Sequence, residues 1–351
     1  MADQAHPPDP REFLRSAEPQ RRLDYLVGRA SMAPSPYNVQ PWRFRSKDPA
    51  RVDLQLDASR RLAEADPEGR LLYLSLGAAL ENFVIAAADL GFAPELEWFP
   101  DGEEAPTAVR IHLGEPGSLP EPDPRVDLQA RRRTGHGPLS GPLEAHVRTA
   151  VSGLDLGEVE LVWAADEDRA ALAELAGRTA SARWRRPAFR QELLDWLRND
   201  AGELEERRDG FQLVSRENLP GWLAGGMRRA LYHAPRLFDP GRRTAKRLER
   251  APAVIALLTP EDGPGHWMAA GRAYQRVGLE LAHAGISLGP EGLLTAYPET
   301  REEAKHILAR GEPQLVARLG RGRPRPPTPR RRLHRVLNPP SPKFPLYPRS
   351  D

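Results

Sequence analysis

Two kinds of hydrophobic pattern alternate along the chain of 351 residues. In some segments apolar residues recur every three or four positions, the spacing that gathers them on one face of a helix. In others apolar and polar residues alternate, or a short apolar run occurs, as is typical of strands. The pattern predicts helices in 10–29 (interrupted near Glu18-Pro19), 71–90, 169–183 and 269–284, a mostly helical stretch in 184–248, and strands in 52–57, 108–113, 158–163, 254–259 and 314–319.

The two most apolar helices are related by a spacing that indicates an internal duplication. When Gly77 is set against Gly271, an offset of 194 residues, helix 71–90 falls on helix 269–284. Each helix follows a predicted strand and ends at a glycine, which is a common helix terminator. We interpret the chain as two related halves that mimic a twofold homodimer and pack their long helices together. A chance likeness between two alanine-rich helices is the alternative.

Composition along the chain predicts its domain boundaries. Residues 114–124 contain four prolines and two glycines and are the best candidate for a linker. From Gly322 onward, proline and arginine dominate and give little reason to expect packing. We therefore expect an α+β fold with a first half at 11–124, a second half at 125–337 that contains a helical insertion at about 184–248, and a Pro-rich tail at 338–351.

A proline-rich stretch, Ala33-Pro34-Ser35-Pro36-Tyr37-Asn38-Val39-Gln40-Pro41-Trp42, lies between the first predicted helix and the first predicted strand. Each proline lacks a backbone N–H and fixes φ, so three of them prevent a regular helix. The resulting stiff loop presents a hydroxyl, two amides and an indole, which suit a polar planar ligand. The alternative is a plain turn whose Ser and Asn cap local backbone while Trp42 belongs to the core.

Composition also narrows the functional classes. Charged residues make up 28% of the chain, but their signs nearly cancel to +2, unlike the one-sided excess of a nucleic-acid binder. Eight arginines lie between residues 318 and 335 with no aromatic residue among them for base stacking, which again argues against nucleic acid. The chain has no cysteine, which excludes thiolate metal sites and iron–sulfur clusters, and its histidines show no metal spacing. Redox chemistry would therefore require a bound cofactor.

The most apolar stretch, residues 71–92, carries Glu81 and Asn82 near its middle. Charge at that position is costly in lipid, so we expect a buried helix of a soluble protein and no membrane span. The first ten residues lack the basic start and apolar centre of a signal peptide, which indicates a cytoplasmic protein.

Two motifs resemble those of a known family. The proline-rich loop resembles the APSxxNxQPW signature of the FMN-dependent nitroreductase family, and Arg132-Arg133-Thr134-Gly135-His136 is similar to its RxS/TxR/K phosphate motif. One motif lies in each half, an order that resembles the Acg-like twin branch of the family. The resemblance covers about residues 12 to 337. It implies a nitroreductase-like fold whose halves form an intramolecular pseudo-dimer, a monomeric state, FMN as cofactor and NAD(P)H as candidate electron donor.

The same resemblance implies which residues bind the flavin. The arginines suit the phosphate, a dianion that accepts several hydrogen bonds. The Glu-Gly pair of Pro290-Glu291-Gly292 would lie beside the flavin ring, and no side chain is required as a catalytic acid or base. The implied binding residues are Pro34, Ser35, Asn38 and Gln40 from the first half, Arg132, Thr134, His136, Glu291 and Gly292 from the second, and the terminal cluster Arg330, Arg331 and Arg332.

The chain departs from the family pattern in two ways. Arginine or lysine often stands where this chain has His136, so the positive charge there is weaker and depends on pH; an ordinary loop histidine is the alternative. The second half has no PSxxNxQPW and the first half has no clear RxS, so we expect one competent flavin site per chain.

Two functions remain open from the sequence. In the first, an oxidoreductase passes electrons through FMN to a small acceptor such as a nitroaromatic or a quinone. In the second, a protein binds or sequesters flavin with little NAD(P)H-driven turnover, because the insertion at 184–248 lies over the flavin as a lid. A degenerate scaffold without flavin is a weaker third interpretation. None of the three involves nucleic acid or membrane partners.

Overall fold

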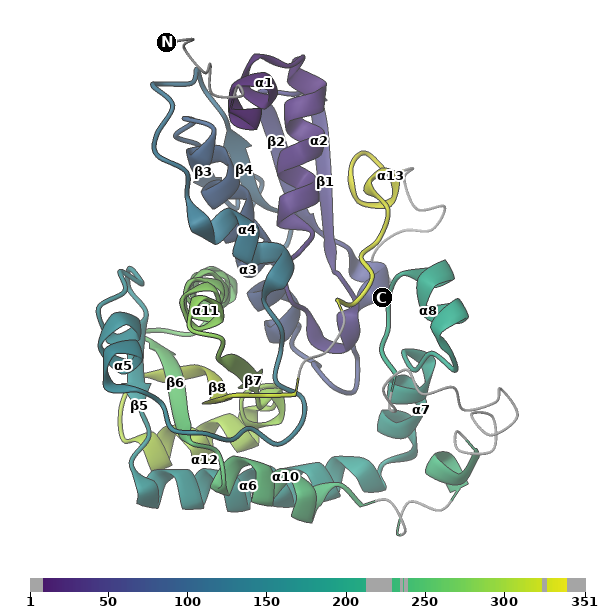
Figure 1. Ribbon diagram of the computed structural model, residues 1–351. Helices are drawn as coiled ribbons and strands as arrows, with labels where there is room; N and C mark the ends of the chain where they lie inside the picture. Colours follow the sequence, from purple (N-terminus) through teal and green to yellow (C-terminus); the bar gives the residue numbers. More distant parts are fainter. Residues whose placement is uncertain (1–8, 213–228, 234–235, 237–238, 324–326, 340–351) are drawn as a thin grey trace.

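Two four-stranded antiparallel sheets frame the computed structural model, which describes residues 9–212, 229–233, 236, 239–323 and 327–339 (Figure 1). The first sheet has the strand order β1-β2-β4-β3 and the second the order β5-β6-β8-β7, so the two sheets repeat one arrangement. The strands are β1 (Trp42–Asp48), β2 (Arg51–Leu56), β3 (Glu95–Trp98), β4 (Thr107–His112), β5 (Glu160–Trp163), β6 (Ala253–Thr259), β7 (Ser287–Pro290) and β8 (Glu312–Gly320).

Helices connect and cover these sheets, and many of them begin at a proline. The fixed φ of proline suits the first helical turn, where its missing N–H costs nothing. The proline-initiated helices are α1 (Pro10–Ser16), α2 (Pro19–Ala30), α4 (Pro124–Arg131), α7 (Pro187–Asp195), α11 (Pro264–His283) and α12 (Pro298–Leu308). The other named helices are α3 (Arg70–Asp89), α5 (Ala145–Ser152), α6 (Asp166–Arg185), α8 (Ala201–Arg207), α10 (Gly241–Glu249) and α13 (Leu333–Val336), with 3-10 turns η1 (Pro36–Asn38), η2 (Ala58–Arg60) and η4 (Gly292–Leu294).

The α+β class and most of the predicted elements are confirmed. All five predicted strands form, as β2, β4, β5, β6 and β8, each with ends within two residues of the prediction. Helix α11 begins five residues before its predicted start, because Pro264 initiates it. Strand β1 was missed: its alternation is short and begins directly after the proline-rich loop. The helices α4, α5 and α12 were also missed.

Helices α3 and α11 pack against each other between the two sheets, and two glycines allow their close approach. A Cβ atom on Gly77 would lie 2.1 Å from the carbonyl oxygen of Met268. A Cβ atom on Gly271 would lie 2.0 Å from the carbonyl oxygen of Leu74. Both distances are far below van der Waals contact, so only glycine fits. The two contacts are related by the same offset of 194 residues that links the helices in the sequence.

Polar contacts across this helix pair follow the same symmetry. The side-chain oxygen of Asn82 accepts a hydrogen bond of 2.7 Å from Gln275. With the offset of 194 residues, Asn82 corresponds to Arg276 and Gln275 corresponds to Glu81, and Arg276 and Glu81 form an ion pair of 2.6 Å. Glu81 is buried and also pairs with Arg272 at 2.8 Å. These contacts are what two halves related by a pseudo-twofold axis would form. That the halves arose by duplication stays a prediction.

The insertion packs on the first half. Apolar side chains of α6 and α7, together with Leu197 and Leu231, form one buried cluster with Val39, Leu62 and Leu72. Glu192 of α7 accepts hydrogen bonds from the backbone N–H groups of Glu64 and Ala65, at 2.9 and 2.8 Å. Figure 1 shows α7 and α8 beside the first half rather than on the second sheet. Residues 213–228 of the insertion lie outside the described residues.

The expectation that the chain has little reason to pack beyond Gly322 is wrong for residues 327–339. Val336 and Leu337 are buried in the core of the first half. The backbone N–H of Asn338 donates to the carbonyl of Phe44 at 2.8 Å, and its side chain accepts from the N–H of Ser46 at 2.8 Å. We call residues 329–338 the C-terminal strap, because they run from the second half onto the first. Most of the predicted tail, from residue 340, lies outside the described residues.

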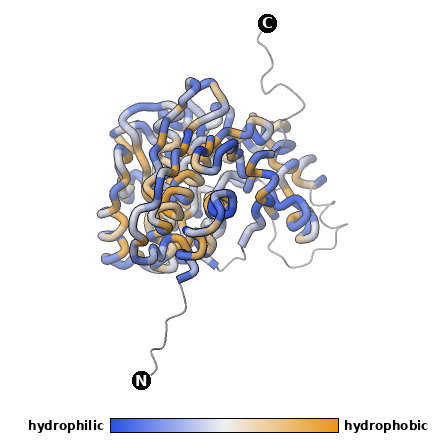
Figure 2. Tube along the Cα trace, turned by 90° about the horizontal axis from the view of Figure 1, so that it is seen from above, coloured by the Kyte–Doolittle hydropathy of each residue, from blue (hydrophilic) through white to orange (hydrophobic). Residues whose placement is uncertain are grey.

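Helix α3 is the one described helix whose length and composition would allow it to cross a membrane. In the structure 78% of that apolar window is buried inside the protein. Figure 2 shows hydrophobic stretches gathered within the body of the molecule. The helix therefore has the position of a core helix, as predicted.

Candidate functional site

The loop at 33–42 has a strained backbone. Tyr37, Asn38 and Gln40 all have positive φ, at 48°, 55° and 52°. A non-glycine residue in this region costs about 1–3 kcal/mol, and such residues cluster where a loop serves a ligand or a switch. The predicted break in helical structure is thus confirmed, apart from the single turn η1. Trp42 is fully buried at the start of β1, so it belongs to the hydrophobic core and does not face a ligand.

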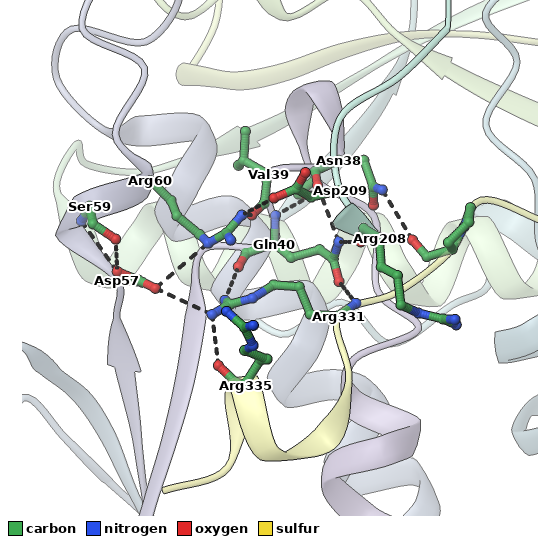
Figure 3. Close-up of polar contacts among 12 residues, drawn as sticks. Asn38, Val39, Gln40, Asp57, Ser59, Arg60, Arg208, Asp209, Arg331 and Arg335 are labelled. Carbon is green, nitrogen blue, oxygen red and sulfur yellow. Dashed lines mark hydrogen bonds and ion pairs between the residues drawn. The ribbon is translucent and has the colours of Figure 1, made fainter. Parts of the chain in front are cut away.

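Gln40 joins three segments that are far apart in the sequence (Figure 3). Its side-chain oxygen accepts from the N–H of Arg331 at 2.7 Å, and its side-chain nitrogen donates to the carbonyl of Arg208 at 2.8 Å. Its own N–H donates to Ser35 Oγ at 2.9 Å. Gln40 is completely buried, and its hydrogen bonds connect the loop to the insertion and to the strap.

Asn38 and Arg331 strengthen the same junction. Asn38 donates to the carbonyl of Pro329 and accepts from Arg330 Nη1, both at 3.1 Å. Arg331 donates to the carbonyl of Gln40 at 3.0 Å and lies 3.6 Å from buried Asp57. The pKa of Arg331 is lowered to about 10, first by burial and then by the charge of Arg60, while Asp57 opposes the shift. Arg331 therefore ties the strap down, whereas the side chain of Arg332 is exposed.

Arg132 and Arg330 come together from opposite ends of the second half. Among the described residues no carboxylate forms an ion pair with either of them. Each Nε is buried without a hydrogen-bond partner. The pKa of Arg330 is lowered to about 9, first by burial and then by the positive charges of Arg132 and Arg133. Such a cluster of enclosed, uncompensated guanidinium groups is built to receive an anion.

The rest of the 132–136 motif lies along the second sheet. Arg132 Nη1 donates to Thr134 Oγ1 at 3.2 Å, and Thr134 forms an isolated parallel bridge with Leu288 of β7. His136 is exposed, and its carbonyl accepts from Arg247 of α10 at 2.9 Å. The structure thus brings Arg132 and Thr134 together, with His136 at the outer end of the motif.

Glu291 and Gly292 lie beneath that motif, directly after β7. The Glu291 carboxylate forms a buried ion pair with Arg318 of β8. Arg318 also donates to the carbonyls of Gly135 and Gly137, at 3.1 and 3.0 Å, and so fixes the motif above it. A Cβ atom on Gly292 would lie 3.0 Å from Leu71 of α3, so Gly292 lies against the first half.

Comparison with known proteins decides the family. No family model matches the chain. The Mycobacterium tuberculosis H37Rv protein "Putative NAD(P)H nitroreductase Rv3131" is 30% identical to it over 326 residues, 88% of each chain. The chain belongs to the nitroreductase family. The same organism's Acg, also named as an NAD(P)H nitroreductase, is 27% identical over 320 residues, 88% of this chain and 93% of its own. The FMN-dependent nitroreductase NfnB of Mycobacterium smegmatis, solved with NADPH, matches 56% of this chain and 86% of its own with 18% identity and a TM-score of 0.33.

Membership in the nitroreductase family confirms the resemblance found in the two motifs. Sequence reasoning nevertheless missed three residues that organise the candidate site, namely Arg208, Asp209 and Arg318. Arg318 had a signal, because it is a lone charge within the apolar strand 315–319. Arg208 and Asp209 had no such signal in the sequence. The contact of Arg208 with Gln40 and that of Asp209 with Arg60 both depend on how the insertion folds back.

Proposed function

We propose that this chain is an FMN-dependent oxidoreductase of the nitroreductase type. It holds one FMN between its two halves and passes electrons from NAD(P)H to a small acceptor such as a nitroaromatic or a quinone. The observation that carries the proposal is that the buried side chains of Arg132 and Arg330 interact electrostatically, while no carboxylate among the described residues forms an ion pair with either of them. The names of the curated relatives support the same reaction class.

The described residues fit the phosphate of FMN. A phosphomonoester carries nearly two negative charges at neutral pH and accepts several hydrogen bonds. Arg132 and Arg330 each offer a buried Nε that has no hydrogen-bond partner among the described residues. Binding a dianion there would satisfy both donors and compensate the burial and the positive charges of Arg132 and Arg133, which together lower the pKa of Arg330.

The neighbouring groups would hold the remainder of the cofactor. Pro34, Ser35 and Asn38 approach from the first half, and Thr134, Glu291 and Gly292 from the second. FMN, when bound, supplies the acceptance of hydride from NAD(P)H and the delivery of electrons to the acceptor. The chain's own part is to orient the flavin through the 132–136 motif, which Arg318 fixes, and to exclude water with α7 and α8. No side chain is assigned as an acid or a base. Gln40 and Arg331 hold the strap in place rather than the flavin, while Arg332 and His136 are exposed at the edge of the site.

The two halves, 11–124 and 125–337, are proposed to form an intramolecular pseudo-dimer that acts as a monomer in the cytoplasm. The paired Gly77 and Gly271 contacts and the repeated strand order support this arrangement. The strap at 329–338 fastens the end of the second half to the first half through hydrogen bonds and buried apolar side chains.

We expect the purified protein to be yellow and to carry close to one FMN per 39.1 kDa particle. The reason is that the described part of the chain has one arginine cluster of this kind, that of Arg132 and Arg330. Light scattering combined with visible absorption measures particle mass and flavin content in one experiment. Two FMN per chain would contradict the single site, a particle of twice the mass would contradict the monomer, and no binding after reconstitution would contradict the proposed function.

A second function, flavin binding with little turnover, is favoured by one observation. The insertion is fastened to the loop through Gln40 and Arg208 and through Glu192, so it covers the first-half side of the site. A cover of that kind would keep NAD(P)H from reaching the flavin.

Anaerobic addition of NADPH or NADH distinguishes the two functions. If the chain is an oxidoreductase, the yellow absorption band bleaches within seconds to minutes, because the flavin accepts hydride. Dithionite provides the control, since it reduces any bound flavin without a nucleotide site. A band that dithionite bleaches and neither nucleotide affects would favour the flavin-holding function.

A further inference from the structure

A third polar group lies beside Arg132. The hydroxyl of Tyr274, on α11, is buried, and no acceptor for its proton lies within hydrogen-bonding range among the described residues. The Arg132 guanidinium next to it can only donate to the hydroxyl, so that contact leaves the phenolic proton unsatisfied. The residue as a whole is 3% exposed, and Arg132 is 7% exposed. A buried hydroxyl proton without an acceptor destabilises the folded protein, so its retention needs a reason.

Helix α11 places this hydroxyl next to the arginine. Gly278 lies one turn after Tyr274, on the same face of the helix. A Cβ atom on Gly278 would lie 3.2 Å from Cδ of Arg132, so the arginine stem crosses the helix where glycine leaves room. Burial lowers the pKa of Arg132, and the Tyr274 phenol beside it partly offsets that effect.

The chemistry of the neighbours defines what the hydroxyl can bind. Guanidinium groups are donors only, so Arg132 and Arg330 cannot accept the phenolic proton. Its acceptor must therefore be an incoming group that also suits two cations, which describes an anion with several oxygens. We propose that the Tyr274 hydroxyl donates a hydrogen bond to a phosphomonoester held by Arg132 and Arg330. The inference deepens the proposed function, on which it rests for identifying that phosphate as part of FMN.

The opposite helix supports this assignment. In the register offset by 194 residues, Tyr274 and Gly278 of α11 correspond to Leu80 and Val84 of α3. Leu80 is fully buried and has no hydroxyl, and Val84 carries a branched side chain where α11 has glycine. The Tyr–Gly pair thus breaks the symmetry of the two helices, and it provides a structural reason for one phosphate site instead of two.

The test compares Tyr274→Phe with the wild type in binding FMN, riboflavin and inorganic phosphate. Phenylalanine keeps the ring and removes only the donor, so FMN affinity should fall about 10- to 150-fold, the loss expected for one hydrogen bond to a charged group. Riboflavin affinity should not change, and stabilisation by inorganic phosphate should weaken. Without ligand, Tyr274→Phe should melt no lower than the wild type. Tyr25→Phe, at a partly buried tyrosine of α2, is the matched control.

The outcomes separate this inference from the proposed function. Equal FMN and phosphate affinities in Tyr274→Phe and wild type would overturn the inference and leave the FMN proposal intact. If the wild type binds no FMN but phosphate stabilises it more than it stabilises Tyr274→Phe, the phosphate site stands and the FMN proposal fails. Gly278→Val, which copies the α3 residue, is a second variant: it should displace Arg132 and weaken FMN binding more than riboflavin binding.

Discussion

Gly77→Ala should lower the free energy of unfolding by about 1–3 kcal/mol or more, although it adds a single methyl group. The new Cβ would lie 2.1 Å from the Met268 carbonyl oxygen. That oxygen belongs to the backbone of α11 and cannot turn aside, so the two central helices must separate. Chemical denaturation followed by circular dichroism measures the loss.

The matched control is Gly28→Ala in α2, where no atom lies within 4 Å of the added Cβ. Here alanine should stabilise the chain by about 0.5–1 kcal/mol through its higher helix propensity. Gly271→Ala should resemble Gly77→Ala, and the double variant should lose less than the sum, because either substitution alone already separates the helices. Equal stability of Gly77→Ala and wild type would refute the close approach of α3 and α11.

Arg132→Met should weaken FMN binding about 10- to 150-fold, the loss expected for one hydrogen bond to a charged group. Riboflavin binding should change much less, since riboflavin carries no phosphate. Methionine retains the apolar stem that passes Gly278, so packing is kept. Quenching of flavin fluorescence during titration gives both affinities.

The stability of the flavin-free protein provides the decisive comparison. Arg132 has no described carboxylate partner, and burial lowers its pKa, so removing its charge should leave the melting temperature without flavin unchanged or higher. Arg335→Met, at an exposed arginine of the strap, is the control and should leave FMN affinity unchanged. Loss of stability with equal weakening of FMN and riboflavin would show that Arg132 is structural.

Much of the fold could be predicted because its pattern is local. The strands at 253–259 and 312–320 are apolar runs that only a covered sheet can bury, and helices α3 and α11 each end at a glycine. The misses have equally local causes. Strand β1 is preceded by prolines, and α13 is a single turn in a segment dominated by arginine and proline.

For the site, the sequence by itself determined the two motifs, the break at the proline-rich loop and the excess of arginine near the C-terminus. Those are properties of neighbouring residues. Only the tertiary structure decided which arginines remain uncompensated. Arg331 lies near Asp57 and Arg318 pairs with Glu291, whereas Arg132 and Arg330 meet without a described carboxylate. The physical reason is that electrostatic energy depends on distance and burial, and the residues that set these values are up to about 290 positions apart in the chain.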